Sequence, residues 1–223
     1  MPLFDVLDLF VDETGRCGPE QMALDEALLE SIKRPLLRVY CWAAPVVTFG
    51  YSQSLAAVRA RFPSTPSVRR WTGGGIVEHG RDWTFSLIVP WEEPFAKARP
   101  QDSYRSIHAA VTMALTEIGC LARLVRSQET SQGTECFASP VTHDVIDPNQ
   151  RKLCGGAQRR TRRGFLHQGS IQDVRLPSDF PLRLLSAIAG KTRRFSASCA
   201  ALARTRELIV QKYATTRWLE RVP

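Results

Sequence analysis

The sequence lacks the long apolar runs from which membrane-spanning helices are made. No stretch of its 223 residues approaches about 20 consecutive apolar side chains, so we expect no membrane partner. The N-terminal segment Met1–Asp5 has no basic residue and contains an early acidic one, which argues against a secretory signal peptide. We therefore expect a cytoplasmic protein, in a compartment where thiols stay reduced.

Paired cysteines and internal repeats are missing as well. The 6 cysteines are scattered and form no C-x-x-C pair, so their spacing predicts neither a zinc site nor a dithiol redox motif. We expect no bound metal, and we expect most of these thiols to be small buried apolar groups. Without repeats or low-complexity tracts, a chain of this length is interpreted as one domain over residues 1–223.

The charge balance is the feature of the composition that calls for an explanation. The 30 lysines and arginines outnumber the 22 aspartates and glutamates, which gives a net charge of +8. Such an excess is typical of proteins that meet nucleic acid, an anionic lipid surface or an acidic protein. A basic protein without any charged partner is the fourth possibility.

Apolar periodicity separates helices from strands along most of the chain. Helices are expected over 18–34, 54–62, 102–119 and from 178 onward. Strands are expected over 37–42, 46–49, 68–72, 76–79, 83–89, 121–125, 143–146 and 165–174. A type I turn over 147–150 places Lys152 at the start of a hairpin arm. Helices and strands mix without strict β-α-β alternation, which predicts an α+β fold around a mixed, largely antiparallel sheet with a helical C-terminal segment.

Three contiguous glycines, Gly73, Gly74 and Gly75, lie between two predicted strands, after Arg70 and before His79. Glycines let the backbone approach a ligand closely, and their amides can hold an anionic or carbonyl oxygen. They match neither the phosphate-binding lysine loop nor the dinucleotide fingerprint, because no Gly-Lys-Ser/Thr follows and the glycines lead into a strand. A glycine hairpin without any ligand is the alternative.

A second segment joins Lys152 to the small residues Gly155, Gly156 and Ala157. A lysine beside such a run can direct its ammonium group at a carbonyl or phosphate held by nearby backbone. On spacing alone, a solvated surface lysine is the competing interpretation.

Taken together and in order, five segments resemble the lipoate and biotin protein ligase superfamily. These segments are Gln21–Leu29, Pro45–Gln53, Arg69–His79, Lys152–Gln158 and Phe165–Ile171. The resemblance runs over about 19–175 and leaves 176–223 as a helical appendage. It implies a tunnel for an eight-carbon acyl chain and a lysine, Lys152, that polarises the acyl carbonyl.

The resemblance also implies the substrate-binding residues and shows two departures from the pattern. The expected binding residues are Arg70, Gly73, Gly74, Gly75, His79, Gly155, Gly156, Ala157 and His167. Gly80 stands where the family usually has aspartate, and Gly156 stands where it usually has serine. We therefore expect the polar contacts of those two side chains to be missing.

Members of this superfamily are either transferases or ATP-dependent ligases, and a nucleophile near the lysine would separate the two. Cys136 resembles the cysteine of octanoyltransferases, and an adjacent ammonium such as that of Lys152 favours the thiolate. Cys154 is a second candidate for the nucleophile, and the alternative is that Cys136 is an unreactive thiol. About 45 residues follow the matched region, which favours a transferase without cofactor. The alternative is a lipoate or octanoate ligase core that uses ATP and Mg²⁺ and has its accessory domain elsewhere.

Arginines flank the lysine segment at Arg159, Arg160, Arg162 and Arg163. A basic rim suits two acidic partners, acyl carrier protein as donor and a lipoyl-domain or glycine-cleavage H-type protein as acceptor. A solvated hairpin tip and a non-catalytic nucleic-acid module are the alternatives, and we expect a monomer that binds no nucleic acid. His79, His143 and His167 could assist proton transfer, although structural roles are favoured for each.

Overall fold

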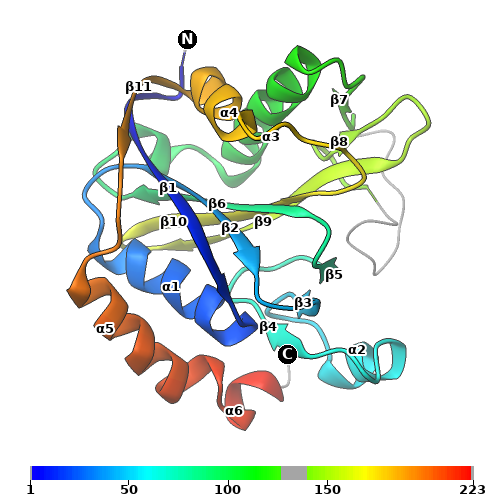
Figure 1. Ribbon diagram of the computed structural model, residues 1–223, viewed down its shortest axis with the longest axis vertical. Coiled ribbons are helices and arrows are strands. Elements are labelled where there is room, and N and C mark those ends of the chain that lie inside the picture. Colours follow the sequence, from blue (N-terminus) through cyan, green and yellow to red (C-terminus); the bar gives the residue numbers. More distant parts are fainter. Residues whose placement is uncertain (1, 127–139, 222–223) are drawn as a thin grey trace.

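An eight-stranded mixed sheet forms the centre of the computed structural model, which describes residues 2–126 and 140–221 (Figure 1). Its strands, in spatial order, are β11 (Ala189–Arg194), β1 (Phe4–Arg16), β2 (Leu36–Trp42), β6 (Trp83–Pro90), β10 (Gly164–Ile171), β9 (Lys152–Thr161), β8 (Val145–Ile146) and β7 (Arg123–Leu124). Strand β1 runs parallel to both of its neighbours, and the other adjacent pairs are antiparallel. The predicted mixed, largely antiparallel sheet is confirmed.

A second, three-stranded sheet lies beside the large one and contains the glycine segment. Its order is β4 (Ser67–Arg69), β3 (Val46–Phe49) and β5 (Ile76–His79), with α2 (Leu55–Arg61) packed nearby. Strand β3 is parallel to β4 and antiparallel to β5. The three glycines therefore connect the two outer strands of this small sheet.

Helices cover both faces of the large sheet. Helices α3 (Pro100–Glu117) and α4 (Phe180–Ile188) pack on one face against Phe85, Leu87 and Val89 of β6. Helices α1 (Gly18–Ser31) and α5 (Cys199–Leu208) pack on the other face, where Ile88 points. Successive side chains of a strand point to opposite faces, so the continuous apolar run in β6 indicates burial on both sides. Within the described ranges, no helix is both long enough and apolar enough to cross a membrane.

A buried charged network fixes α1 on the sheet. Arg38 of β2 is 0% exposed and donates to Asp12 of β1 and Asp25 of α1, at 2.7 Å each. Asp25 also accepts hydrogen bonds from Ser86 at 2.6 Å and from Gln168 at 2.8 Å. Buried ions need such compensation, because an unpaired charge in the interior costs several kcal/mol. The network connects α1 with four strands of the sheet.

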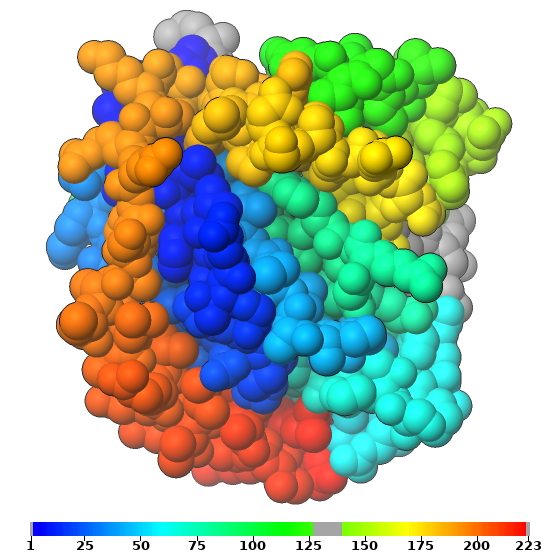
Figure 2. Space-filling view, in the orientation of Figure 1, coloured from blue at the N-terminus to red at the C-terminus, as the bar shows by residue number. Residues whose placement is uncertain are grey.

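The C-terminal segment continues through η3 (Ile209–Tyr213) and α6 (Thr216–Leu219) and returns to the small sheet. Figure 2 shows it in red beside the cyan residues around α2. Arg69 of β4 is 0% exposed and donates to five backbone carbonyl groups. Three of these carbonyls belong to the C-terminal segment (Trp218, Leu219 and Arg221) and two to the loop before α2 (Tyr51 and Gln53).

Two neighbouring strands of the large sheet, β1 and β11, were missed by the predictions. Strand β1 was not predicted, because acidic residues such as Asp8 and Asp12 interrupt its apolar pattern and are buried only through pairing with arginines. The C-terminal segment was expected to be wholly helical, yet Ala189–Arg194 forms β11 along β1. Only Ala189 of this strand is buried, so backbone pairing and not hydrophobic alternation holds it. The predicted strands over 121–125 and 143–146 shrink to two residues each.

Candidate active site

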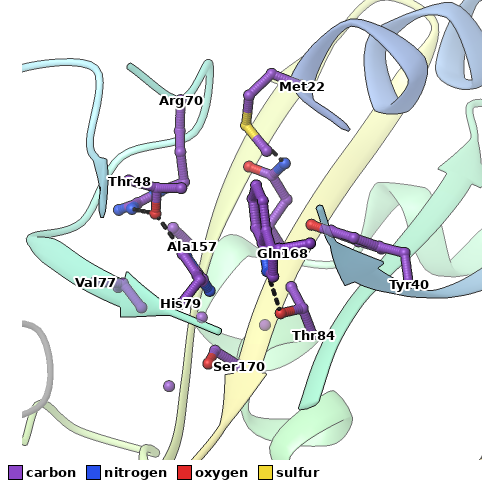
Figure 3. A pocket seen from close by; sticks show the side chains of 14 residues that line it. Met22, Tyr40, Thr48, Arg70, Val77, His79, Thr84, Ala157, Gln168 and Ser170 are labelled. Carbon is purple, nitrogen blue, oxygen red and sulfur yellow. Dashed lines mark hydrogen bonds between the residues drawn. The ribbon is translucent and has the colours of Figure 1, made fainter. Parts of the chain in front are cut away.

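A pocket lies between the large sheet and the small sheet, and both sheets contribute side chains to its lining (Figure 3). Its floor includes Gly155, Ser170, Thr84 and Tyr40, which are register partners on β9, β10, β6 and β2. With strands about 4.8 Å apart, this row extends about 14 Å. The pocket encloses about 390 Å³ of space outside the protein atoms, part of it open to solvent. The remaining lining residues are Met22, Trp42, Thr48, Arg70, Val77, His79, Gly156, Ala157, Gln168 and Gly169.

Arg70 holds the glycine segment in shape. Its guanidinium donates to the carbonyls of Gly73 at 2.9 Å and Gly75 at 2.7 Å, and to the Thr48 hydroxyl at 2.6 Å. Gly74 has φ +84°, a left-handed conformation that glycine adopts without strain. A side chain on Gly50 would lie 2.0 Å from the Gly74 carbonyl oxygen. Arg70 thus organises the loop, while Gly74 and Gly50 allow its close approach to β3.

His79 is oriented by a chain of hydrogen bonds on the same wall. Its Nε2 lies 2.8 Å from the Thr48 hydroxyl and its Nδ1 lies 2.7 Å from the Asp82 carboxylate. Because Arg70 donates to Thr48, the hydroxyl proton is available for His79 Nε2, which assigns a proton to Nδ1. Burial alone would raise the pKa of Asp82, but hydrogen bonds from His79, Ser170 and Thr84 outweigh burial and lower it.

The carboxylate that is missing at Gly80 is supplied two residues later, by Asp82. Asp82 accepts a hydrogen bond from the Gly80 amide at 3.1 Å as well as from His79. Gly80 has φ +134°, which favours glycine and lets the chain turn back on His79. Sequence reasoning missed Asp82, although an aspartate three residues after a candidate histidine was a usable signal.

The polar side chains of the pocket are largely engaged with one another. Trp42 donates to the Thr84 hydroxyl at 2.9 Å and lies against the His79 ring, with centroids 4.4 Å apart. Gln168 accepts from Thr72 at 2.7 Å and donates to Asp25. Buried polar groups that are already paired offer few new hydrogen bonds to a ligand. The cavity is therefore suited to an apolar chain, with Met22, Val77 and Ala157 providing further apolar contacts.

Lys152 begins β9, as predicted, and is 3% exposed. Its Nζ lies 2.6 Å from Asp144 Oδ2, and the Asp144 side chain is fully buried. A side chain on Gly155 would lie 2.2 Å from Lys152 Cε and 2.5 Å from Nζ. Gly155 therefore provides the space for the ammonium group. Gly155 also lines the pocket, so the lysine sits directly behind one end of the pocket floor.

The second departure from the family pattern, Gly156, is explained by His167. A side chain at Gly156 would lie 2.6 Å from both Cε1 and Nε2 of the His167 ring. His167 is 0% exposed and packs on the α3 side of the sheet with His108, their ring centroids 5.3 Å apart. His167 was predicted to bind substrate, but its side chain does not line the pocket among the described residues.

Both histidines of this pair are held neutral. Burial lowers the pKa of His108 to about 3, and burial followed by the neighbouring His108 lowers the pKa of His167 well below its usual value. The Nε2 atoms of both rings have no hydrogen-bond partner among the described groups.

The predicted cysteines and arginines have different outcomes. Cys136 lies outside the described residues, so its role stays a prediction. Cys154 is 0% exposed within the apolar core on the α3 side. In the predicted basic rim, Arg159 lies over the rings of Tyr51 and Trp71, and Arg160 donates to the Ala96 carbonyl and the Ser103 hydroxyl. Arg162 and Arg163 are exposed at the hairpin turn.

The chain is similar in sequence and in fold to known proteins. Over 166 residues the chain is 33% identical to the octanoyltransferase LipM of Kyrpidia tusciae, covering 67% of this chain and 60% of that protein. It is 31% identical over 220 residues to the Symbiobacterium thermophilum LipM, covering 86% of this chain and 76% of that protein. The chain thus spans less than two thirds of the length of the first of these relatives.

The same fold occurs in a solved structure of a putative lipoate protein ligase from T. acidophilum with bound lipoic acid. The TM-score is 0.78 at 20% identity, with 97% of this chain and 99% of that chain covered. The family model for the lipoyl protein ligase A/B catalytic domain matches residues 18–191. This range extends the resemblance found in the sequence past 175, through α4 and into β11. The chain belongs to the lipoyl protein ligase A/B catalytic domain family.

Proposed function

We propose that this chain is an acyltransferase that moves an octanoyl group from acyl carrier protein to a lysine of a lipoyl-domain or glycine-cleavage H-type protein. The group would pass through a thioester on Cys136. The observation that carries the proposal is the buried Lys152 ammonium, which packs against Gly155 at the edge of an apolar pocket. The names of the curated relatives, octanoyltransferases, support transfer over ligation.

The reaction needs two acyl transfers, the first from the donor to the enzyme and the second from the enzyme to the acceptor. In the first, the Cys136 thiolate attacks the thioester carbonyl of the donor, and the carrier leaves as a thiolate, which takes up the proton that the cysteine had released. In the second, the neutral amine of the acceptor lysine attacks the Cys136 thioester, an amide forms, and the cysteine thiol is regenerated. Each step passes through a tetrahedral oxyanion, and the Lys152 ammonium is placed to stabilise that charge.

The pocket supports a medium-length acyl chain as the group transferred. Its floor row of about 14 Å starts at Gly155, beside Lys152, and ends at Tyr40 and Trp42. In this proposal the glycine segment and Ala157 flank the carbonyl end, and Arg70 keeps the segment in shape. His79 and Trp42 form part of the pocket wall beside the acyl chain.

An intact-mass measurement tests the proposal. Mixing the protein with octanoyl carrier protein is expected to add one octanoyl group, and that adduct is expected to disappear on addition of an acceptor domain. Cys136→Ala is expected to form no adduct, with Cys154→Ala as the matched control that still forms it. An absent adduct in the unaltered protein, or one that survives Cys136→Ala, would contradict the proposal.

A second candidate, an ATP-dependent lipoate or octanoate ligase core, is favoured by the fold shared with the T. acidophilum protein. This candidate uses ATP and Mg²⁺ and predicts pyrophosphate release from ATP and free acid without any carrier protein. Pyrophosphate release together with a silent adduct assay would replace the transferase proposal with this one.

A further inference from the structure

Asp144 connects three groups around the buried lysine. Its Oδ2 lies 2.6 Å from Lys152 Nζ and accepts the Val141 amide at 2.8 Å. Its Oδ1 accepts the Tyr104 hydroxyl at 2.6 Å. The side chains of both members of the ion pair are almost fully buried, at 2% exposure for Lys152 and 0% for Asp144. A carboxylate held on both oxygens has little freedom to rotate away from the ammonium.

Tyr104 of α3 fixes Asp144 from the opposite side. Its hydroxyl accepts the Gly156 amide at 3.0 Å and donates to Asp144 Oδ1 at 2.6 Å, which is nearer than the second acceptor, the Gly156 carbonyl at 3.2 Å. Burial first, and then the charge of Asp144, raise the pKa of Tyr104 well above its usual value, so the hydroxyl remains a donor throughout the working pH range. The Tyr104 ring also lies against His108, with centroids 4.0 Å apart.

Among the described groups around Lys152, Asp144 carries the opposite charge and acts as the counter-ion. From α3 come the hydroxyl of Tyr104 and the ring of His108, whose pKa of about 3 leaves it neutral. From β9 itself come Gly155 and the buried Cys154. Asp144 is the carboxylate within ion-pair distance in the described part of the chain. An ammonium group held in one position by a buried carboxylate is preorganised to stabilise an oxyanion.

We propose that Asp144, oriented by the Tyr104 hydroxyl, is the positioning residue that holds the Lys152 ammonium against Gly155 at the pocket edge. This inference rests on the proposed acyl transfer. Asp144 and Tyr104 act only through Lys152 and touch no substrate. Neither residue stood out in the sequence, because Asp144 lies eight positions from Lys152 and Tyr104 lies on another element.

The test compares Asp144→Asn, Tyr104→Phe and the double variant in the full-length protein. Asp144→Asn is expected to lower kcat for octanoyl transfer about 100-fold while KM for the donor changes less than about twofold. Tyr104→Phe is expected to lower kcat about tenfold. The double variant should be no slower than Asp144→Asn, because both changes act on one ammonium.

A second readout separates this inference from the proposed function. Reductive methylation with formaldehyde and borohydride modifies neutral amines, and peptide mass reports the extent at Lys152. Lys152 should be modified at least about tenfold faster in Asp144→Asn than in the unaltered protein at the same pH. This result would stand even if the adduct assay failed and the ligase assay succeeded. If Asp144→Asn does not fold, the kcat and the Lys152 labelling rate of Tyr104→Phe test the inference instead.

An unchanged kcat in Asp144→Asn, an unchanged labelling rate or additive losses in the double variant would overturn the inference.

Discussion

The imidazole ring of His167 on β10 fills the volume beside Gly156 of β9, since a side chain on the glycine would lie 2.6 Å from the ring. The pair explains why a glycine stands at a position where related sequences usually carry serine. An imidazole from the next strand fills the volume that the serine side chain would take.

Gly156→Ser is expected to be strongly destabilising by itself, because the new side chain collides with a buried ring. Overpacking of this kind costs about 1–3 kcal/mol. His167→Gln alone opens space and costs a comparable amount. The double variant should be more stable than the sum of the two single changes predicts, by about 1 kcal/mol or more. Urea unfolding of the four proteins measures this coupling, and simple additivity would show that the two residues do not share the space.

Gly155→Ala is expected to remove most of the transfer activity with little change in folding. The methyl group would displace the flexible end of Lys152, which lies 2.2 Å from its position. A loss of about 100-fold in kcat corresponds to removal of one oxyanion-stabilising group. Gly73→Ala is the matched control for folding, because its methyl group meets nothing within 4 Å. Equal unfolding temperatures for the two variants would assign the loss to Lys152, and full activity in Gly155→Ala would contradict the assignment.

Mild acid is expected to destabilise the protein, because two buried histidines resist protonation in the folded state. The pKa of His108 falls from 6.5 to about 3 on folding, and the pKa of His167 falls well below 6.5. Below pH 6.5 the unfolded chain therefore binds protons that the folded chain does not, and stability declines as the pH falls toward 3.

The expected loss for His108 is about 2 kcal/mol between pH 7 and pH 5, and His167 adds a loss of the same sign. Urea unfolding at the two pH values measures the total loss, and His108→Gln should remove the part that His108 contributes. Stability that does not change between pH 7 and pH 5 would show that the two rings are not held neutral.

Arg69→Lys is expected to release the C-terminal segment from the small sheet. The guanidinium donates to five carbonyls in a planar fork, and an ammonium cannot reproduce that geometry. The loss should be about 2–4 kcal/mol. Hydrogen exchange of residues 215–221 should become faster at the same time.

Arg59→Lys is the matched control for this change. Arg59 also reaches the C-terminal segment, through an exposed ion pair with Glu220 at 3.5 Å. Exposed pairs contribute little to stability, so the unfolding temperature should be almost unchanged. Equal effects of the two substitutions would contradict the assignment of Arg69 as the residue that holds the C-terminal segment on the small sheet.

The sequence by itself determined the local elements and the segments that carry chemistry. Helices α1 and α3, the glycine turn and the position of Lys152 at the start of β9 all follow from short-range patterns, because capping, periodicity and turn residues act within a few positions. The joint order of the five segments also determined the family, which the match over residues 18–191 confirms.

Only the tertiary structure decided which partner each polar residue has. Asp82 replaces the carboxylate missing at Gly80, Asp144 becomes the counter-ion of Lys152, and His167 fills the space above Gly156. The edge strand β11 likewise depends on backbone pairing with β1, far away in the sequence. The free energy of a buried charge or a paired strand edge depends on groups that folding brings together, and no local pattern contains that information.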